Sequence, residues 1–397
     1  MGQTRFMHRP TESTNSDNNG NLHFSDHDSL TLGPNWFASV MGTGIVATAG
    51  ATLPFHVRGM HVFTLSVWLV SLVVLAILIV AFSVHWIRHP GAVARYARDV
   101  TLAQFFGAPP MALLTVGAGT LLVGHSLLGE STALTLDWVL WSLGTAAGLV
   151  TAVAVPYILF TRIEVRHDAA FGGWLMPVVP PMVSAATGGL LIPHVSSASG
   201  RATLLYGCYA MFGISLFASM IIITLIWSRL AHFGSSGSVR VPTLWIVLGP
   251  LGQSITAAGI LGTNASLAVA TPLARGFSFF SVAYGVPTWG FAVLWIFLAL
   301  GLTIRTARHH LPFHLTWWSF TFPVGTFVTG TARLALATGL PAFRVAAGVA
   351  YVALLGAWFL VAALTLRGVL AGQLLRSPLA GGQGPAAKKG DLSAAPL

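Results

Sequence analysis

Long apolar runs separated by short polar stretches make up most of this chain. Because a helix needs about 20 residues to cross the hydrocarbon core of a bilayer, runs of that length are candidate transmembrane helices. Ten runs qualify, at residues 35–53, 62–86, 106–125, 134–160, 173–193, 203–229, 243–262, 278–303, 316–336 and 344–366. The pattern predicts an all-α integral membrane protein with ten transmembrane helices and short loops.

Helix-disrupting residues recur at a similar place in every second run, with spacings of 68, 71, 69 and 73 residues. They are Gly42, with Gly44 close behind it, then Pro110, Pro181, Pro250 and Pro323. A proline inside a helix leaves a carbonyl unpaired, which hydrocarbon tolerates only where protein or a watery cavity satisfies it. We therefore expect five helix breaks that line one shared pore.

Composition agrees with this class and defines the ends of the membrane domain. Charged residues are 8% of the chain, hydrophobic residues are 55%, and the mean hydropathy is +0.77, which is typical of an integral membrane protein. Residues 1–33 and 371–397 are polar or rich in Gly, Ala and Pro, and predict two disordered tails around a domain at residues 34–370. The net charge of +10 is spread singly over loops, which argues against nucleic-acid binding.

The distribution of Lys and Arg predicts the orientation in the membrane. Fifteen of these residues fall on the side that holds both termini and five on the other, so both termini are expected in the cytoplasm of a multi-pass plasma (inner) membrane protein. The five are Arg58, Arg201, Arg275, Arg344 and Arg333.

With that orientation, all the broken helices run from inside to outside. Repeats of one orientation can be related only by an axis along the membrane normal. We therefore expect five parallel-repeat helical hairpins around a central pore. The small-residue helices would line the pore, and the bulkier even-numbered helices would face lipid.

The chemistry of the spans favours an anion over a cation. Acidic residues are almost absent from them, and Asp137 lies near a predicted helix end. Broken helices present free N–H groups at positive dipole ends, which bind anions weakly. Four arginines at the outer ends of hairpins either attract anions to an outer mouth or serve as ordinary interfacial anchors: Arg58, Arg201, Arg275 and Arg344.

Phe322 precedes the break at Pro323 in the ninth run. A large aromatic side chain in a lining of small residues is a candidate hydrophobic gate. On the spacing alone, a packed or lipid-facing phenylalanine is favoured over a gate.

Three motifs together resemble the tellurite-resistance/dicarboxylate transporter family. They are residues 34–37 (PNWF) with 41–45 (MGTGI), residues 249–253 (GPLGQ) and residues 317–323 (WWSFTFP). That family includes a bacterial tellurite-resistance channel homologue, a yeast malate permease, fungal sulfite efflux pumps and plant slow anion channels. The resemblance implies five hairpins around a pore, homotrimers, and a pore closed by Phe322, or by Phe320 if the register differs by two.

The combined expectation is channel-like transport of small anions, either C4-dicarboxylates such as malate or sulfite-like oxyanions, and not an enzyme. No cofactor or metal is expected. A negative-inside potential, worth about 2.3 kcal/mol per charge per 100 mV, favours export.

Two alternatives remain open. A proton-coupled dicarboxylate symporter of the same fold would use histidines such as His125 or His194. A membrane-bound haem or metal enzyme would draw on the cluster of His309, His310 and His314, although adjacent histidines cannot share a helix face.

Overall fold

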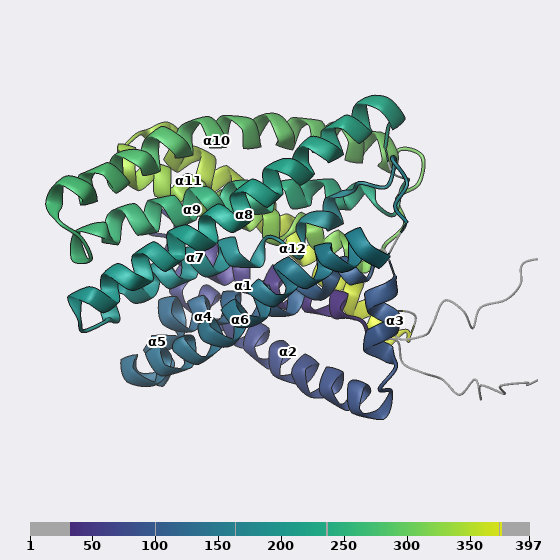
Figure 1. The fold of residues 1–397 in the computed structure, drawn as a ribbon, viewed down its shortest axis with the longest axis horizontal. Helices are drawn as coiled ribbons and strands as arrows, with labels where there is room; N and C mark the ends of the chain where they lie inside the picture. Colours follow the sequence, from purple (N-terminus) through teal and green to yellow (C-terminus); the bar gives the residue numbers. More distant parts are fainter. Residues whose placement is uncertain (1–31, 100, 163, 236, 373, 375–397) are drawn as a thin grey trace, which may run out of the picture. The chain divides into compact units, whose positions relative to one another are not determined.

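A computed structural model describes residues 32–374 except 100, 163, 236 and 373. The two predicted tails lie almost entirely outside these described residues. Within them the chain is helical without strands, which confirms the all-α prediction (Figure 1). The α-helices are α1 (Phe37–Ala51), α2 (Met60–Arg88), α3 (Ala92–Arg98), α4 (Ala108–Gly119), α5 (His125–Leu128), α6 (Glu130–Arg162), α7 (Pro180–Leu191), α8 (Ala198–Phe233), α9 (Leu248–Asn264), α10 (Thr271–Ala307), α11 (Phe322–Thr338) and α12 (Pro341–Leu370).

Among the described residues, seven helical segments are long and apolar enough to cross a membrane. They are Met60–Arg88, Ala103–Leu128, Glu130–Arg162, Ala198–Phe233, Val241–Leu267, Thr271–Ala307 and Pro341–Leu370. The remaining three predicted runs contain α1, α7 and α11, which have 15, 12 and 17 residues. Ten spans in five hairpins therefore remain a prediction.

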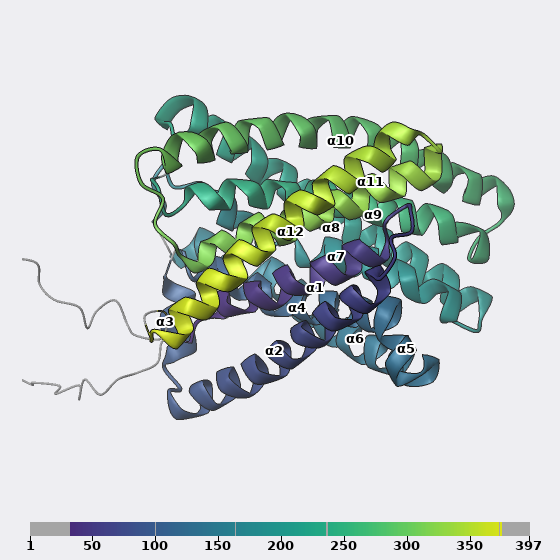
Figure 2. The same ribbon diagram turned by 180° about the vertical axis from the view of Figure 1, so that it is seen from behind.

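The helices fall into two groups by burial and by contact. Five are almost entirely buried: α1, α4, α7, α9 and α11, which we call the central helices. Each contacts the next, and α11 contacts α1, so the contacts form a closed circuit. The peripheral helices α2, α6, α8, α10 and α12 each pack against the central helix that precedes them in the chain, as Figure 2 shows for α2 beside α1.

The prolines lie at the starts of the central α-helices rather than in their interiors. Pro110, Pro181, Pro250 and Pro323 each fall within the first three residues of α4, α7, α9 or α11. Backbone N–H groups in the first turn have no partner within the α-helix itself, so proline is well tolerated there. Short 3₁₀ helices precede these starts: η2 (Ala103–Gly107), η4 (Gly172–Leu175), η6 (Val241–Val247) and η8 (Leu315–Phe320).

The break expected at Gly42 and Gly44 is wrong, because α1 is a continuous α-helix. The two glycines instead allow close packing. A Cβ on Gly42 would overlap the side chains of Thr321 and Trp318, and one on Gly44 would lie 2.9 Å from Cγ2 of Thr115.

Tryptophans on four peripheral helices bond the central helix that comes next around the circuit, at about the same period as the prolines. Trp68 donates to the Val116 carbonyl at 3.3 Å, and Trp141 donates to the Ser184 carbonyl at 3.0 Å. The other two donate to hydroxyls, Trp289 to Thr331 at 3.0 Å and Trp358 to Thr43 at 3.2 Å. The last bond joins α12 to α1 and closes the circuit.

The third helix pair, α7 and α8, lacks this tryptophan. Phe212 of α8 holds the corresponding place and has no polar hydrogen to donate. Its ring instead packs edge-on against Tyr284 of α10, with 5.5 Å between the centroids. The Tyr284 hydroxyl donates to Ser254 Oγ of α9 at 2.8 Å, so a tyrosine of α10 bonds the central helix that lacks a tryptophan donor.

Gly252 allows α9 and α11 to approach closely, and Gly252→Ala should destabilise the protein. A Cβ there would overlap the backbone of Thr326 and Phe327. Because backbone cannot move aside as a flexible side chain can, we expect a loss of about 1–3 kcal/mol in the free energy of unfolding. Thermal denaturation in detergent should show a lower midpoint.

The matched control is Gly249→Ala, three residues earlier on the same helix. A Cβ at Gly249 would have no atom within 4 Å. Alanine is the better helix former, so this variant should be as stable as the wild type or slightly more stable. Equal destabilisation by both changes would contradict the close-approach argument.

Candidate functional site

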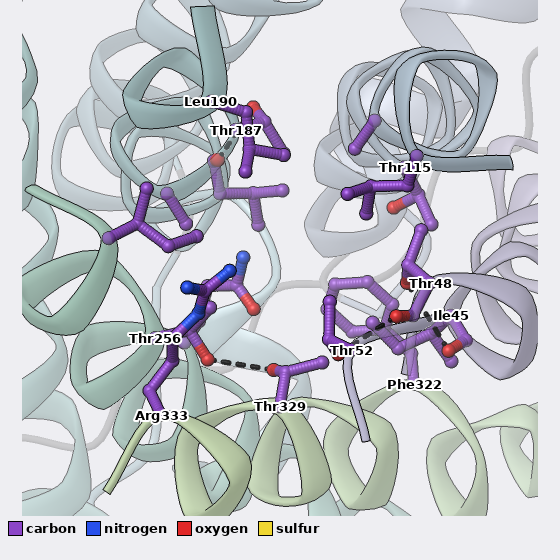
Figure 3. A pocket seen from close by; sticks show the side chains of 16 residues that line it. Ile45, Thr48, Thr52, Thr115, Thr187, Leu190, Thr256, Phe322, Thr329 and Arg333 are labelled. Atoms are coloured by element: carbon purple, nitrogen blue, oxygen red, sulfur yellow. Dashed lines mark hydrogen bonds between the residues drawn. The ribbon is translucent and has the colours of Figure 1, made fainter. Parts of the chain in front are cut away.

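Two cavities lie among the central helices, one on each side of Phe322. The larger, about 40 Å³, draws its lining from all five central helices, and we call it the threonine cavity. Its lining is Ile45, Thr48, Thr52, Thr115, Ala118, Leu122, Val183, Ala186, Thr187, Leu190, Gln253, Thr256, Ile260, Phe322, Thr329 and Arg333 (Figure 3).

The smaller cavity, about 20 Å³, is lined by apolar side chains and a single serine, and we call it the methionine cavity. Its lining is Ala38, Met41, Phe105, Met111, Met176, Val179, Ile246, Gly249, Leu315, Trp318, Ser319, Phe322 and Pro323.

Phe322 contributes to the walls of both cavities and is only 2% exposed. It is the first residue of α11, directly after Thr321, whose backbone angles of φ −104° and ψ −73° mark the junction with η8. The ring therefore lies where the 3₁₀ segment changes to α-helix.

Phe320 lines neither cavity. Its ring packs edge-on against Trp245 and Trp317, with centroid distances of 5.8 and 5.7 Å. Of the two phenylalanines singled out from the sequence, only Phe322 lies between the cavities.

The polar lining of the threonine cavity consists largely of hydroxyl groups. Thr115 and Thr187 donate to carbonyls one turn earlier on their own helices, at 2.7 and 2.9 Å. Thr256 and Thr329 share a 2.7 Å hydrogen bond between α9 and α11, drawn dashed in Figure 3. The amide oxygen of Gln253 is buried without a hydrogen-bond partner among the described residues, so it is a polar group available to a ligand.

Arg333 supplies the one charged side chain of the threonine cavity. Figure 3 shows its guanidinium extending from α11 into the space among the labelled threonines. The stem packs against Gly259, where a Cβ would lie 2.8 Å from the Cβ of Arg333. Within the described part of the chain, the guanidinium makes no ion pair and no hydrogen bond.

Arg333 and Phe322 share one face of α11. They are eleven residues apart, which is about three turns and roughly 16 Å along the axis. The sequence alone places Arg333 only among the five cations on the side of the membrane opposite the termini. The signal that could have identified it is a single cation in an otherwise neutral run, at helical spacing from the phenylalanine.

The predicted break residues contribute little to the cavity walls. Pro323 lines the methionine cavity, whereas Pro110, Pro181 and Pro250 line neither cavity, and neither do Gly42 and Gly44. Their neighbours, such as Met111 and Gly249, supply the lining instead.

The four arginines proposed for an outer mouth lie outside both cavities. Arg201 donates to the carbonyls of Leu267, Val195 and Ser196 at 2.6, 2.9 and 3.1 Å, and so fixes the start of α8 against a neighbouring loop. Arg58, Arg275 and Arg344 are exposed. Attraction of anions by these side chains remains a prediction.

A model of the voltage-dependent anion channel family matches residues 31–366 of this sequence. The chain belongs to that family. The sequence motifs predicted the tellurite-resistance/dicarboxylate transporter family, which is this same group of transporters. The family prediction is therefore confirmed. Members are channels and transporters rather than enzymes, and anion transport by a multi-pass membrane protein is the activity of the voltage-dependent anion channel family.

Individual relatives cover most of the chain at low identity. A sulfite efflux pump of Trichophyton rubrum is 26% identical over 339 residues, which are 84% of this chain and 89% of the relative. An uncharacterized transporter of Methanocaldococcus jannaschii is 25% identical over 300 residues, 75% of this chain and 82% of the relative. A malic acid transport protein of Schizosaccharomyces pombe is 20% identical over 352 residues, which are 85% of this chain and 78% of the relative.

Proposed function

We propose that this protein conducts small anions through a pore formed by five helical hairpins, and that Phe322 closes the pore between the two cavities. The observation that carries the proposal is the position of Phe322, which is buried and lines both cavities. The closed circuit of central helices supports a single pore along their common axis.

The electrostatics of the threonine cavity support an anion as the permeant species. Its lining holds one guanidinium and no carboxylate. A cation there would meet an unpaired positive charge, whereas an anion would meet a guanidinium, an amide and several hydroxyls. Weak contacts of this kind also suit permeation, because a conducted ion must leave its site.

Substrate size favours a sulfite-like oxyanion over a C4-dicarboxylate in the closed state. A cavity needs about 10–15 Å³ to hold one water, so about 40 Å³ accommodates a few waters or one small oxyanion. Relatives are named both as sulfite efflux pumps and as malic acid transport proteins. Sulfite is therefore the first substrate to test and malate the second.

We further propose a plasma membrane location with both termini cytoplasmic, export driven by the membrane potential, and a homotrimer. Large apolar side chains are exposed on the peripheral helices, as expected for surfaces that contact lipid or a second copy. Native mass spectrometry in mild detergent would show a mass three times that of the 41.8 kDa chain.

Flux measurements in proteoliposomes test the function itself. We expect sulfite, and then malate, nitrate and chloride, to move down their gradients at a rate that rises with the electrical driving force. In planar bilayers, the reversal potential at a fixed gradient of nitrate or chloride, whose charge does not change with pH, should not change with pH. A reversal potential that moves with the proton gradient would establish a proton-coupled symporter instead.

A further inference from the structure

Asp137 is a buried carboxyl group without a partner. It is 1% exposed, and neither carboxylate oxygen has a hydrogen bond among the described residues. The sequence placed it near a helix end, but α6 begins at Glu130, so Asp137 lies two turns inside. An ionised carboxylate without a partner is costly to bury, whereas a neutral carboxylic acid is much less so.

Asp137 packs directly behind a helix that lines the threonine cavity. A Cβ on Gly117 of α4 would lie 2.6 Å from Oδ1 of Asp137, so glycine makes room for the carboxyl group. At 100° per residue, Gly117 projects away from Thr115 and Ala118, which line the cavity. The carboxyl group is therefore about one helix diameter, roughly 10 Å, from the cavity.

No fixed charge on the neighbouring elements compensates Asp137. The elements packed against α6 are α4, α5, α7, the 3₁₀ helix η2 and the π-helical turn η3 (Thr120–Gly124). Of these, α4, α7, η2 and η3 contain no titratable residue, and α5 contains only His125, whose Nδ1 lies 3.0 Å from the Leu121 carbonyl oxygen. The other titratable groups of α6 are Glu130, Tyr157 and Arg162.

We propose that Asp137 is a proton-binding site linked to anion occupancy of the threonine cavity. The inference rests on the proposed function, since it takes the cavity as an anion site. With its proton bound, Asp137 is neutral and leaves the cavity potential to Arg333. When the proton leaves, the carboxylate places a negative charge one helix away and opposes the anion.

The sign and size of the linkage follow from Coulomb's law. The Asp137 carboxylate and an anion in the threonine cavity would be two like unit charges about 10 Å apart. At an effective dielectric constant of about 20, their repulsion weakens anion binding about tenfold. Anion affinity is therefore highest at acidic pH and falls about tenfold as Asp137 ionises. By reciprocity, a bound anion strengthens proton binding by the same factor.

Infrared titration of the whole protein in lipid measures both halves of the proposal. Nitrate is the probe because, unlike sulfite, it stays fully ionised between about pH 5 and about pH 9. We expect a protonated-carboxyl band at acidic pH that is absent from Asp137→Asn. Saturating nitrate should move the loss of the band by about one pH unit toward alkaline pH. Absence of the band at acidic pH, or no shift with nitrate, would overturn the proposal.

Nitrate flux against pH supplies the transport readout. Wild-type flux at subsaturating nitrate should fall about tenfold from the acidic to the alkaline end, whereas Asp137→Asn should stay at the acidic level throughout. His125→Gln should keep the wild-type profile. A flat profile in His125→Gln together with a wild-type profile in Asp137→Asn would assign the proton to the histidine and overturn the proposal.

Two further variants separate proton binding from folding. Gly117→Ala displaces the carboxyl group without removing it, and should shift the titration while the infrared band remains. Asp168→Asn is the charge-matched control. Arg166 hydrogen-bonds Asp168 at 3.0 Å in an exposed loop and lowers the pKa of its carboxyl group, so that group stays ionised throughout and its loss should leave the profile unchanged. If the wild type transports no nitrate, the proposed function fails. The infrared titration still decides whether Asp137 binds a proton and whether nitrate binding strengthens that proton binding.

Discussion

Replacing Phe322 with alanine should raise anion flux at least about tenfold. The ring lies between the threonine and methionine cavities, and both walls include it. Removing it joins the two spaces and replaces an apolar constriction, which excludes water, by a passage that water can enter. Single-channel recordings in planar bilayers and sulfite flux in proteoliposomes would both measure the change.

The increase should depend on side-chain size at this position. Phe322→Leu should give a flux between those of the wild type and the alanine variant, and Phe322→Trp should stay closed. Phe320→Ala is the matched control, because Phe320 is two residues away, packs against Trp245 and Trp317, and lines neither cavity. A correctly inserted Phe322→Ala protein with wild-type flux would show that the pore closes elsewhere.

Loss of the ring also carries a cost in stability. A buried phenylalanine replaced by alanine typically lowers the free energy of unfolding by about 3–5 kcal/mol. Flux should therefore be normalised to folded protein, measured by size-exclusion chromatography and thermal denaturation.

Replacing Arg333 with glutamine should weaken anion binding in the pore roughly tenfold to a hundredfold. A hydrogen bond to a charged group contributes about 1.5–3 kcal/mol, and Arg333 supplies the one charge in the lining of the threonine cavity. The concentration at which flux saturates should rise accordingly. In a salt gradient, the reversal potential should also move away from the equilibrium potential of the anion, as expected for a pore with less preference for anions.

Two comparisons decide whether the charge acts inside the pore. Arg333→Lys keeps the charge but loses the planar fork, so it should retain anion selectivity with intermediate affinity. Arg344→Gln removes the same charge from an exposed position outside both cavities. Equal effects of Arg333→Gln and Arg344→Gln would mean that the net surface charge, rather than a site in the cavity, governs the anion.

The sequence was most informative where a physical rule is tied to composition. Hydropathy identified the apolar runs and the helical class, because only helices and closed barrels satisfy their backbones in lipid. The regular proline spacing located the starts of four central helices. It did not show that 3₁₀ turns precede them, because proline fits the first turn of a helix as well as a break within one.

Other features depended on tertiary contacts that no local pattern reports. Arg333 and Asp137 looked like residues near span ends, because the sequence does not show how far a helix continues past its apolar core. The structure places one in a cavity wall and the other behind it. The donor roles of the tryptophans at positions 68, 141, 289 and 358 could not be predicted, because each depends on the position of a helix from another part of the chain.

The bond from Trp358 to Thr43 has a consequence for synthesis. It joins residues 315 positions apart, and it links the last helix of the circuit back to the first. The helix α1 emerges first, has only 15 residues, and is buried almost throughout. One side of α1 has no protein neighbour until α11 and α12 have been made and inserted. Of the described helices, α1 is thus made first and enclosed last, and a chain truncated before α11 should leave it exposed to quality-control proteases.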